Sequence, residues 1–190
     1  DDMEYDVVII GAGPAGYVAA IRAGQTGLKT AIIDKAHVGG MCLNWGCIPT
    51  KALIESGRTY QKVKDAATFG VAGIDKKKLS FDYSKAAKRA GRIVSRLTKG
   101  VEFLLKKNGV ELIIGEAAVR SANAVSVNNR TLETRHILIA TGSRPALPEG
   151  APDPDKWTDV SELLNLEDKP EHVVIAGSGG HTVELAQFSA

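Results

Sequence analysis

The two cysteines of the chain, Cys42 and Cys47, are the residues best suited to chemistry. They stand five positions apart in the segment Gly39–Lys51, which reads GGMCLNWGCIPTK. Only two cysteines in 190 residues do not make a secreted disulfide framework, and in a cytosolic protein such a pair is more often catalytic or metal-binding. Cysteines at i and i+5 reach disulfide distance at the start of a helix if its first turn is distorted, which Gly46 and Pro49 would allow.

Three uses of this cysteine pair are open on the residues alone. A helix N-terminus stabilises a thiolate, which favours thiol–disulfide exchange. A structural zinc site needs four ligands, and we expect no metal because the histidines are scattered along the chain. Two inert buried thiols are the third possibility. The histidines are His37, His136, His172 and His181.

A glycine-rich loop near the start of the chain matches the GxGxxG pattern over residues 11–16. It lies between an expected strand, Tyr5–Ile10, and an expected helix, Pro14–Ala23. In such a loop the first glycine permits a tight turn, the second lets the backbone approach a pyrophosphate, and the third lets helix and strand pack closely. The unpaired N–H groups of the helix N-terminus attract phosphate. The candidate dinucleotide-binding residues here are Gly11, Gly13, Pro14, Ala15 and Gly16.

An acidic residue, Asp34, ends the next apolar run, Lys29–Ile33, about 20 residues after the loop. A carboxylate at this place can accept hydrogen bonds from ribose hydroxyls, whereas it would repel the 2′-phosphate of NADP. FAD and NAD both remain possible on this evidence. The run also completes a βαβ unit, whose two strands we expect to be parallel and adjacent.

The rest of the chain is expected to form the elements that support these residues. Cys42–Lys64 reads as one helix, and apolar residues at three- and four-residue spacing from Tyr83 to Leu105 predict an amphipathic helix that ends at Asn108-Gly109. The segments Glu111–Val119, Ala124–Val127 and Thr134–Ile139 predict a small β-meander that leads into a last parallel strand.

The last quarter of the chain indicates a domain boundary. Several prolines stiffen residues 145–170, for which we expect a linker without helix or strand. A second βα unit is then expected over residues 171–190, with a strand at His172–Ala176, a glycine turn and a helix at Val183–Phe188. The fold class is therefore α/β, with one domain at 1–144 and the start of another.

Composition excludes several classes of partner. The chain has 24 Lys and Arg against 22 Asp and Glu, and this net charge of +2 gives no reason to expect nucleic acid or a membrane surface as partner. No run approaches the roughly 20 apolar residues of a membrane span. We expect a cytoplasmic protein.

Three segments together resemble the pyridine nucleotide-disulfide oxidoreductase family. They are Asp6–Asp34, Gly39–Lys51 and Ile137–Arg144. The resemblance implies a Rossmann-like FAD-binding domain with a redox-active disulfide over 1–144, and the truncated start of a Rossmann-like NAD-binding domain over 171–190. Relatives continue beyond this point, which implies that the 190-residue chain alone is inactive.

The resemblance also implies roles for single residues. Cys42 would be the thiol that exchanges with substrate sulfur, and Cys47 the thiolate against the flavin. Lys51 would lie near the reactive edge of the flavin ring, paired with Glu184. Thr182 stands where the second glycine loop usually has its third glycine. The further cofactor-binding positions that the resemblance implies are Lys35, Gly40, Met41, Gly115, Ala117, Ala140, Thr141, Gly142, Gly177 and Gly179.

Within the family, the residues around the cysteines are most similar to the branch that oxidises lipoyl groups. This implies a homodimer that oxidises dihydrolipoamide on the lipoyl domains of 2-oxo acid dehydrogenase complexes, with FAD as carrier and NAD as acceptor. Met41, Trp45 and Thr50 differ from the commonest Thr, Val and Ser of that branch. A mercuric or glutathione-type reductase, or a flavin-binding redox module without turnover, is the alternative.

Overall fold

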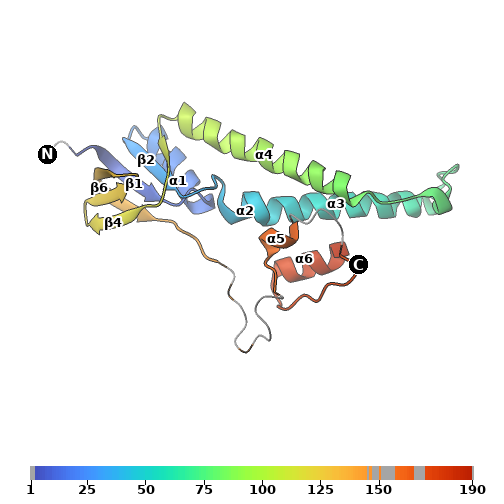
Figure 1. Ribbon diagram of the computed structural model, residues 1–190. Helices are drawn as coiled ribbons and strands as arrows, with labels where there is room; N and C mark the ends of the chain where they lie inside the picture. The colour runs from blue at the N-terminus through green and yellow to red at the C-terminus, as the bar shows by residue number, and fades with distance from the viewer. Residues whose placement is uncertain (1–2, 145, 147–149, 151–156, 165–169, 190) are drawn as a thin grey trace. The chain divides into compact units, whose positions relative to one another are not determined.

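The structure of the chain is a computed structural model that describes residues 3–144, 146, 150, 157–164 and 170–189 (Figure 1). It contains two compact units. The sheet unit comprises residues 1–44 and 96–146, and the helical unit comprises residues 45–95 and 147–190. These units follow spatial contacts; the division into domains at 1–144, 145–170 and 171–190 stays a prediction.

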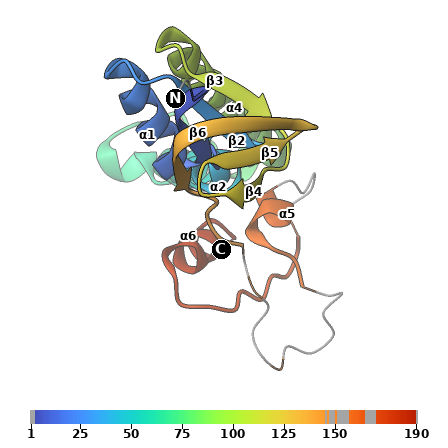
Figure 2. The same ribbon diagram turned by 90° about the vertical axis from the view of Figure 1, so that its left-hand side faces the viewer.

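The sheet unit is built on one six-stranded sheet, in the order β3-β2-β1-β6-β5-β4. The strands β3, β2, β1 and β6 are parallel neighbours, whereas β6, β5 and β4 pair antiparallel, and Figure 2 shows these last three side by side. The predicted parallel pairing of the first two strands is confirmed. The strands are β1 (Tyr5–Ile10), β2 (Thr30–Asp34), β3 (Glu111–Ile114), β4 (Ala118–Ser121), β5 (Ala124–Val127) and β6 (Arg130–Ile139).

Strand β6 joins the two kinds of pairing. Its first residues, from Arg130 to Glu133, pair with β5, and its remaining residues, from Thr134 to Ile139, pair with β1. The central strands are covered on both faces, since four consecutive residues of β2 are at most 1% exposed. One cluster of buried apolar residues forms a core of this unit; its buried members are Tyr5, Val8, Ala31, Ile33, Ile113, Val125, Val127 and Leu132.

Helix α1 (Pro14–Gln25) packs on β1 and β2 through small residues. Its C-terminal end also lies close to the loop after α4 (Tyr83–Lys107), because a Cβ on Gly24 would stand 2.3 Å from the carbonyl oxygen of Asn108. The expected helix at Pro14–Ala23 is therefore confirmed and is two residues longer. The long helix α4 also ends as predicted, before Gly109, whose φ is +70°.

The helical unit contains α3 (Cys47–Lys64), the first half of α4, α5 (Val160–Leu164) and α6 (Gly180–Ser189), with the short 3-10 helices η1 (Ala66–Phe69) and η2 (Lys76–Lys78). Small apolar residues of α3 and α4 form its core. Among the described residues, none of the helices is both long and apolar enough to cross a bilayer. The core residues are Ala52, Leu53, Ala86 and Ala90, with Ile93, Leu164 and Phe188 packed against them.

Two predicted elements are wrong in their extent. The single helix expected over Cys42–Lys64 is two helices, α2 (Gly40–Trp45) and α3, because Gly46 between them has a non-helical backbone, with φ −125° and ψ −118°. The segment expected over Glu111–Val119 holds two strands. Strand β3 pairs in parallel with β2 and so does not belong to the meander.

Two predictions about the last part of the chain are also wrong. Residues 172–176 form no strand and pair with no strand in the described part of the chain. Val174 in this run is 97% exposed. The expected linker contains α5. This helix has an N-terminal cap, since the Asp159 carboxylate accepts the backbone N–H of Glu162 at 3.0 Å. The expected helix at Val183–Phe188 is present as part of α6.

A polar cluster at one end of β1 gives the sheet unit a dependence on pH. The Tyr5 hydroxyl donates to the Glu111 carboxylate, which also accepts from Arg130 at 3.2 Å. Burial and this carboxylate raise the pKa of Tyr5, whereas the hydrogen bond from Tyr5 lowers the pKa of Glu111. A carboxyl group whose pKa is lowered in the fold stabilises the fold at pH values above its pKa in the unfolded chain, and this stabilisation is lost in acid. A tyrosine whose pKa is raised stabilises the fold at pH values below its pKa in the unfolded chain, and this stabilisation is lost in strong base.

We expect Glu111→Gln to flatten the acid side of the stability curve. The glutamine has no charge to lose, so the free energy of unfolding should fall less between about pH 5 and pH 3 than it does in the parent chain. Urea unfolding at a series of pH values measures this. Glu133→Gln on β6 is the control, because Glu133 is exposed and forms no ion pair with a described residue. An acid limb equally steep in both variants would contradict the role of Glu111.

Candidate active site

The predicted cofactor positions of the sheet unit follow the carboxyl ends of its parallel strands. Gly11 follows β1, Lys35 follows β2, Gly115 follows β3 and Ala140 follows β6. Ligands of open parallel sheets bind outside these ends. The topology thus gathers at one edge the residues that the sequence had placed on four separate strands.

The glycine loop has no space for side chains at two of its positions. Gly11 has φ +105°, and a Cβ there would stand 2.2 Å from the carbonyl oxygen of Ala140. A Cβ on Gly16 would stand only 1.7 Å from the carbonyl oxygen of Gly11. Helix α1 begins at Pro14, and its first turn has neither a side-chain cap nor an acidic residue. Its N-terminal N–H groups are therefore available to an anion.

The Asp34 carboxylate holds this loop in place. One oxygen accepts the N–H of Ala12 at 2.8 Å, and the other accepts the N–H groups of Ala36 at 3.0 Å and His37 at 2.9 Å. A carboxylate has about four acceptor sites, so three backbone amides use most of them. The structure thus gives Asp34 a positioning role that the sequence did not indicate; ribose binding by Asp34 stays a prediction.

The start of the cysteine segment is docked on the glycine loop. The N–H of Gly39 donates to the carbonyl oxygen of Ala12 at 2.8 Å, and a Cβ on Gly40 would stand 2.6 Å from the Cα of Gly13. Asn44 fixes this approach, because its side-chain amide donates to the carbonyl oxygens of Val38 and Gly40 at 3.0 and 2.9 Å. Sequence reasoning missed Asn44; its only signal was a polar residue between the two cysteines.

The cysteines lie in different elements. Cys42 lies in α2 beside the half-buried Met41, and Cys47 is the first residue of α3. Both are half-buried thiols in the structure, so the disulfide between them stays a prediction. Thr50 fixes the first turn of α3, because its hydroxyl donates to the carbonyl oxygen of Gly46 at 2.7 Å and the residue is 1% exposed.

Lys51 and Glu184 are paired within the helical unit. The Lys51 ammonium lies 2.7 Å from one Glu184 carboxylate oxygen, which joins α3 to α6. The other oxygen of Glu184 is buried and accepts no hydrogen bond from the described residues. The Lys51 side chain is 58% exposed, so the pair adds little to stability while its ammonium remains accessible.

The second glycine loop precedes α6. Gly177 has φ +137°, and a Cβ there would stand 2.9 Å from the Thr182 hydroxyl oxygen, whereas Gly179 faces open space. Thr182 belongs to the first turn of α6, and its N–H donates to the carbonyl oxygen of Gly179 at 3.0 Å. The NAD site expected at this loop stays a prediction.

The remaining predicted positions surround the end of β3 and β6. Gly115 donates its N–H to the Asp34 carbonyl oxygen at 2.9 Å, and a Cβ there would stand 2.4 Å from the side-chain oxygen of Asn128. Ala117 packs against the apolar core of the sheet unit. The N–H of Ala140 donates to the carbonyl oxygen of Ile10 at 2.8 Å. Thr141 and Gly142 follow β6 and are exposed, as is Lys35. Among the described residues, no three His, Cys, Asp or Glu side chains gather as metal ligands.

Comparisons with known proteins place these features in a family. The sequence profile described as pyridine nucleotide-disulphide oxidoreductase matches residues 5–190. The chain is 45% identical over 188 residues to a dihydrolipoyl dehydrogenase of Acholeplasma laidlawii, with 96% of this chain and 55% of the relative covered. It is 42% identical over 193 residues to the enzyme of the same name from Chlorobaculum parvum, with 98% and 40% covered.

A third relative gives the same result. The dihydrolipoyl dehydrogenase of Geobacillus stearothermophilus is 40% identical over 187 residues, which cover 96% of this chain and 39% of the relative. The chain thus spans about half the length, or less, of the curated relatives that it matches. The family profile matches nearly every residue, and the glycine loop is in contact with the start of the cysteine segment. The chain therefore belongs to the pyridine nucleotide-disulphide oxidoreductase family.

Proposed function

We propose that this chain is the FAD- and dithiol-bearing part of an NAD-dependent dihydrolipoyl dehydrogenase. The observation that carries the proposal is the contact between the two motifs: Gly39 is hydrogen-bonded to Ala12, and Gly40 lies against Gly13. This contact links the start of the cysteine segment to a loop shaped for a dinucleotide. The names of the relatives support the choice of substrate.

The residues present fit a dinucleotide cofactor. The pyrophosphate of FAD would lie at the N-terminus of α1, over the glycines at 11 and 13, where backbone N–H groups are available and no acidic residue stands in the first turn. Asp34 has one acceptor site left, which suits a ribose hydroxyl. FAD, when bound, supplies a two-electron acceptor that passes electrons on to NAD.

The chain's own chemistry is a dithiol–disulfide exchange between the substrate and Cys42–Cys47. One substrate thiolate attacks the Cys42 sulfur, which forms a mixed disulfide and releases Cys47 as a thiolate. The second substrate thiolate then attacks the mixed disulfide, releases Cys42 and closes the lipoamide ring. Dihydrolipoamide loses two electrons and two protons, and the cysteine pair takes up the two electrons.

Lys51 and Glu184 act together in this proposal. The accessible Lys51 ammonium would place positive charge at the reactive edge of the flavin ring, and Glu184 holds the lysine side chain in position. The second glycine loop, with Gly177 and Gly179, would take the NAD pyrophosphate. The partners would be lipoyl domains of 2-oxo acid dehydrogenase complexes and a second copy of the whole protein, in the cytoplasm.

Thiol counting tests the substrate class. The oxidised chain should gain two alkylatable thiols, Cys42 and Cys47, on treatment with dihydrolipoamide, and in the reduced chain iodoacetamide should modify Cys42 first. Dihydrolipoamide should act at least tenfold faster than glutathione, because ring closure makes its second step intramolecular. Equal rates would favour a glutathione-type reductase, and failure of the two cysteines to form a disulfide would overturn the proposal.

A further inference from the structure

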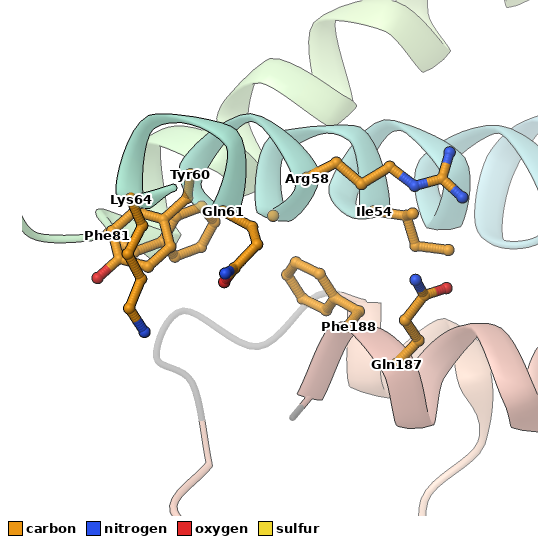
Figure 3. A pocket seen from close by; sticks show the side chains of 9 residues that line it. Ile54, Arg58, Tyr60, Gln61, Lys64, Phe81, Gln187 and Phe188 are labelled. Carbon is orange, nitrogen blue, oxygen red and sulfur yellow. The ribbon is translucent and has the colours of Figure 1, made fainter. Parts of the chain in front are cut away.

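A pocket of about 390 Å³ lies in the helical unit, on the side of α3 that faces α6 (Figure 3). This volume is within the usual range of small-molecule sites, about 300–1,000 Å³. None of its lining residues belongs to the dinucleotide or cysteine sites described above. They are Ile54, Gly57, Arg58, Tyr60, Gln61, Lys64, Phe81, Gln187 and Phe188.

The centre of the pocket is apolar and its aromatic rings are mutually packed. The ring of Phe81 lies 5.7 Å from that of Tyr60 and 6.5 Å from that of Phe188, both at steep angles. Edge-to-face contacts of this kind are favourable and fix the positions of the rings. Ile54 on α3 is 8% exposed. The apolar walls are therefore held in place before any ligand arrives.

The ends of the pocket are cationic. Figure 3 shows Arg58 and Lys64 at opposite ends of the α3 wall, with the amide of Gln61 between them and that of Gln187 on α6 at the Arg58 end. Neither cation forms an ion pair with a described residue, and none of the described residues that line the pocket is acidic. The Asp65 carboxylate accepts a hydrogen bond from the Gln61 side-chain amide at 2.6 Å and orients this amide. Apolar walls with unpaired cations at the rim suit a ligand that is both apolar and anionic.

We propose that this pocket binds a small amphipathic organic anion, a carboxylate, sulfonate or phosphate on an aromatic or aliphatic body. The body packs against Ile54, Phe81 and Phe188. The anionic group is held by Arg58 or Lys64, by the Gln187 amide and by the second N–H of the Gln61 amide, which Asp65 does not accept. This site is separate from the cofactor positions, and the inference does not rest on the proposed enzymatic function.

A ligand in this pocket would reinforce the contact between α3 and α6. Ile54 lies one helical turn from Lys51, and Gln187 lies one turn from Glu184, so the ligand would bridge the two helices that this ion pair already joins. A ligand that binds only the packed form stabilises it by mass action. The amides of residues 180–189 should therefore exchange with solvent more slowly when the pocket is filled.

Fluorescence titration of the full 190-residue chain with anilinonaphthalene sulfonate, with and without saturating FAD, tests the proposal. The neutral analogue N-phenylnaphthylamine has the same rings without the sulfonate, and we expect it to bind at least tenfold more weakly. Arg58→Gln and Lys64→Gln should each weaken sulfonate binding about threefold to fivefold, as expected for exposed charges. Lys62→Gln, on α3 but outside the pocket, is the matched control and should change nothing.

Each result decides the matter. The site is supported if sulfonate affinity falls in the Arg58 and Lys64 variants but not in Lys62→Gln, and if the probe shifts the side-chain amide resonances of Gln61 and Gln187. Equal affinity for the neutral analogue, equal effects of Lys62→Gln, or displacement of the probe by FAD would overturn it. Circular dichroism of the variants excludes unfolding as the cause, because both cations are exposed and their substitution leaves the aromatic core intact.

Discussion

Gly16→Ala is expected to destabilise the chain by about 2 kcal/mol and to weaken FAD binding at least tenfold. The added Cβ would stand 1.7 Å from the carbonyl oxygen of Gly11, a backbone atom that cannot rotate away. Helix α1 must then move off β1, which displaces the N–H groups that would meet the pyrophosphate. Urea unfolding measures the first effect, and quenching of flavin fluorescence on binding measures the second.

Gly100→Ala is the matched control for this change. Gly100 is also helical, in α4, and a Cβ there would meet nothing within 4 Å. This substitution should stabilise the chain by about 0.5–1 kcal/mol and leave FAD affinity unchanged, because alanine is the better helix former. Similar effects of the two substitutions would show that the close approach at Gly16 has no role in cofactor binding.

Asp34→Ala is expected to cost about 3 kcal/mol of stability and to abolish measurable FAD binding. The substitution leaves the N–H groups of Ala12, Ala36 and His37 without their acceptor, and it releases the glycine loop from the segment after β2. Asp34→Asn keeps one acceptor oxygen and should lose less stability and less FAD affinity than Asp34→Ala. Calorimetric titration with FAD and thermal unfolding measure both effects.

Asp75→Ala provides a control of the same chemistry. Asp75 also accepts a backbone N–H, that of Lys77 at 3.0 Å, but it lies on an exposed turn far along the chain from the glycine loop. Its loss should cost no more than about 1 kcal/mol and leave FAD affinity unchanged. Strong FAD binding by Asp34→Ala would contradict the positioning role of Asp34.

The elements with a clear hydrophobic period were predictable from the sequence. Strands β1 and β5 have the expected bounds, and α4 ends where Asn108-Gly109 indicated, because β-branched runs and three- and four-residue spacing are local properties of the sequence. Pairing is a property of the whole sheet. The sequence therefore did not reveal that β3 joins the parallel strands, whereas the last parallel strand expected at Thr134–Ile139 is confirmed as the part of β6 that pairs with β1.

Other failures have local causes that composition alone hides. The break between α2 and α3 depends on the backbone angles of one glycine, Gly46, in a region that otherwise favours helix. Helix α5 is only five residues long and depends on its Asp159 cap, so its pattern was too short to stand out among prolines. The run at His172–Ala176 has strand propensity, but propensity produces a strand only where a partner strand is available.

The candidate site was predictable as a list of residues but not as an arrangement. The glycine positions follow from the loop pattern, because steric need acts within a few residues. The contacts between the motifs are tertiary: the N–H of Ala12 donates to the Asp34 carboxylate, and the carbonyl oxygen of Ala12 accepts the N–H of Gly39. No spacing rule connects residues so far apart, and these contacts are what joins the dinucleotide loop to the cysteine segment.

Anaerobic titration of the FAD-loaded chain with dihydrolipoamide, followed by long-wavelength absorbance, tests most directly whether the cysteine pair and the flavin form one site. Cys47→Ser is the variant to compare, because a thiolate against the oxidised flavin gives a long-wavelength charge-transfer band that a serine hydroxyl cannot give. The account predicts a band in the parent chain that is absent in Cys47→Ser, with FAD bound equally by both. Bound FAD with the same spectrum in both chains, or no binding of FAD at all, would contradict it.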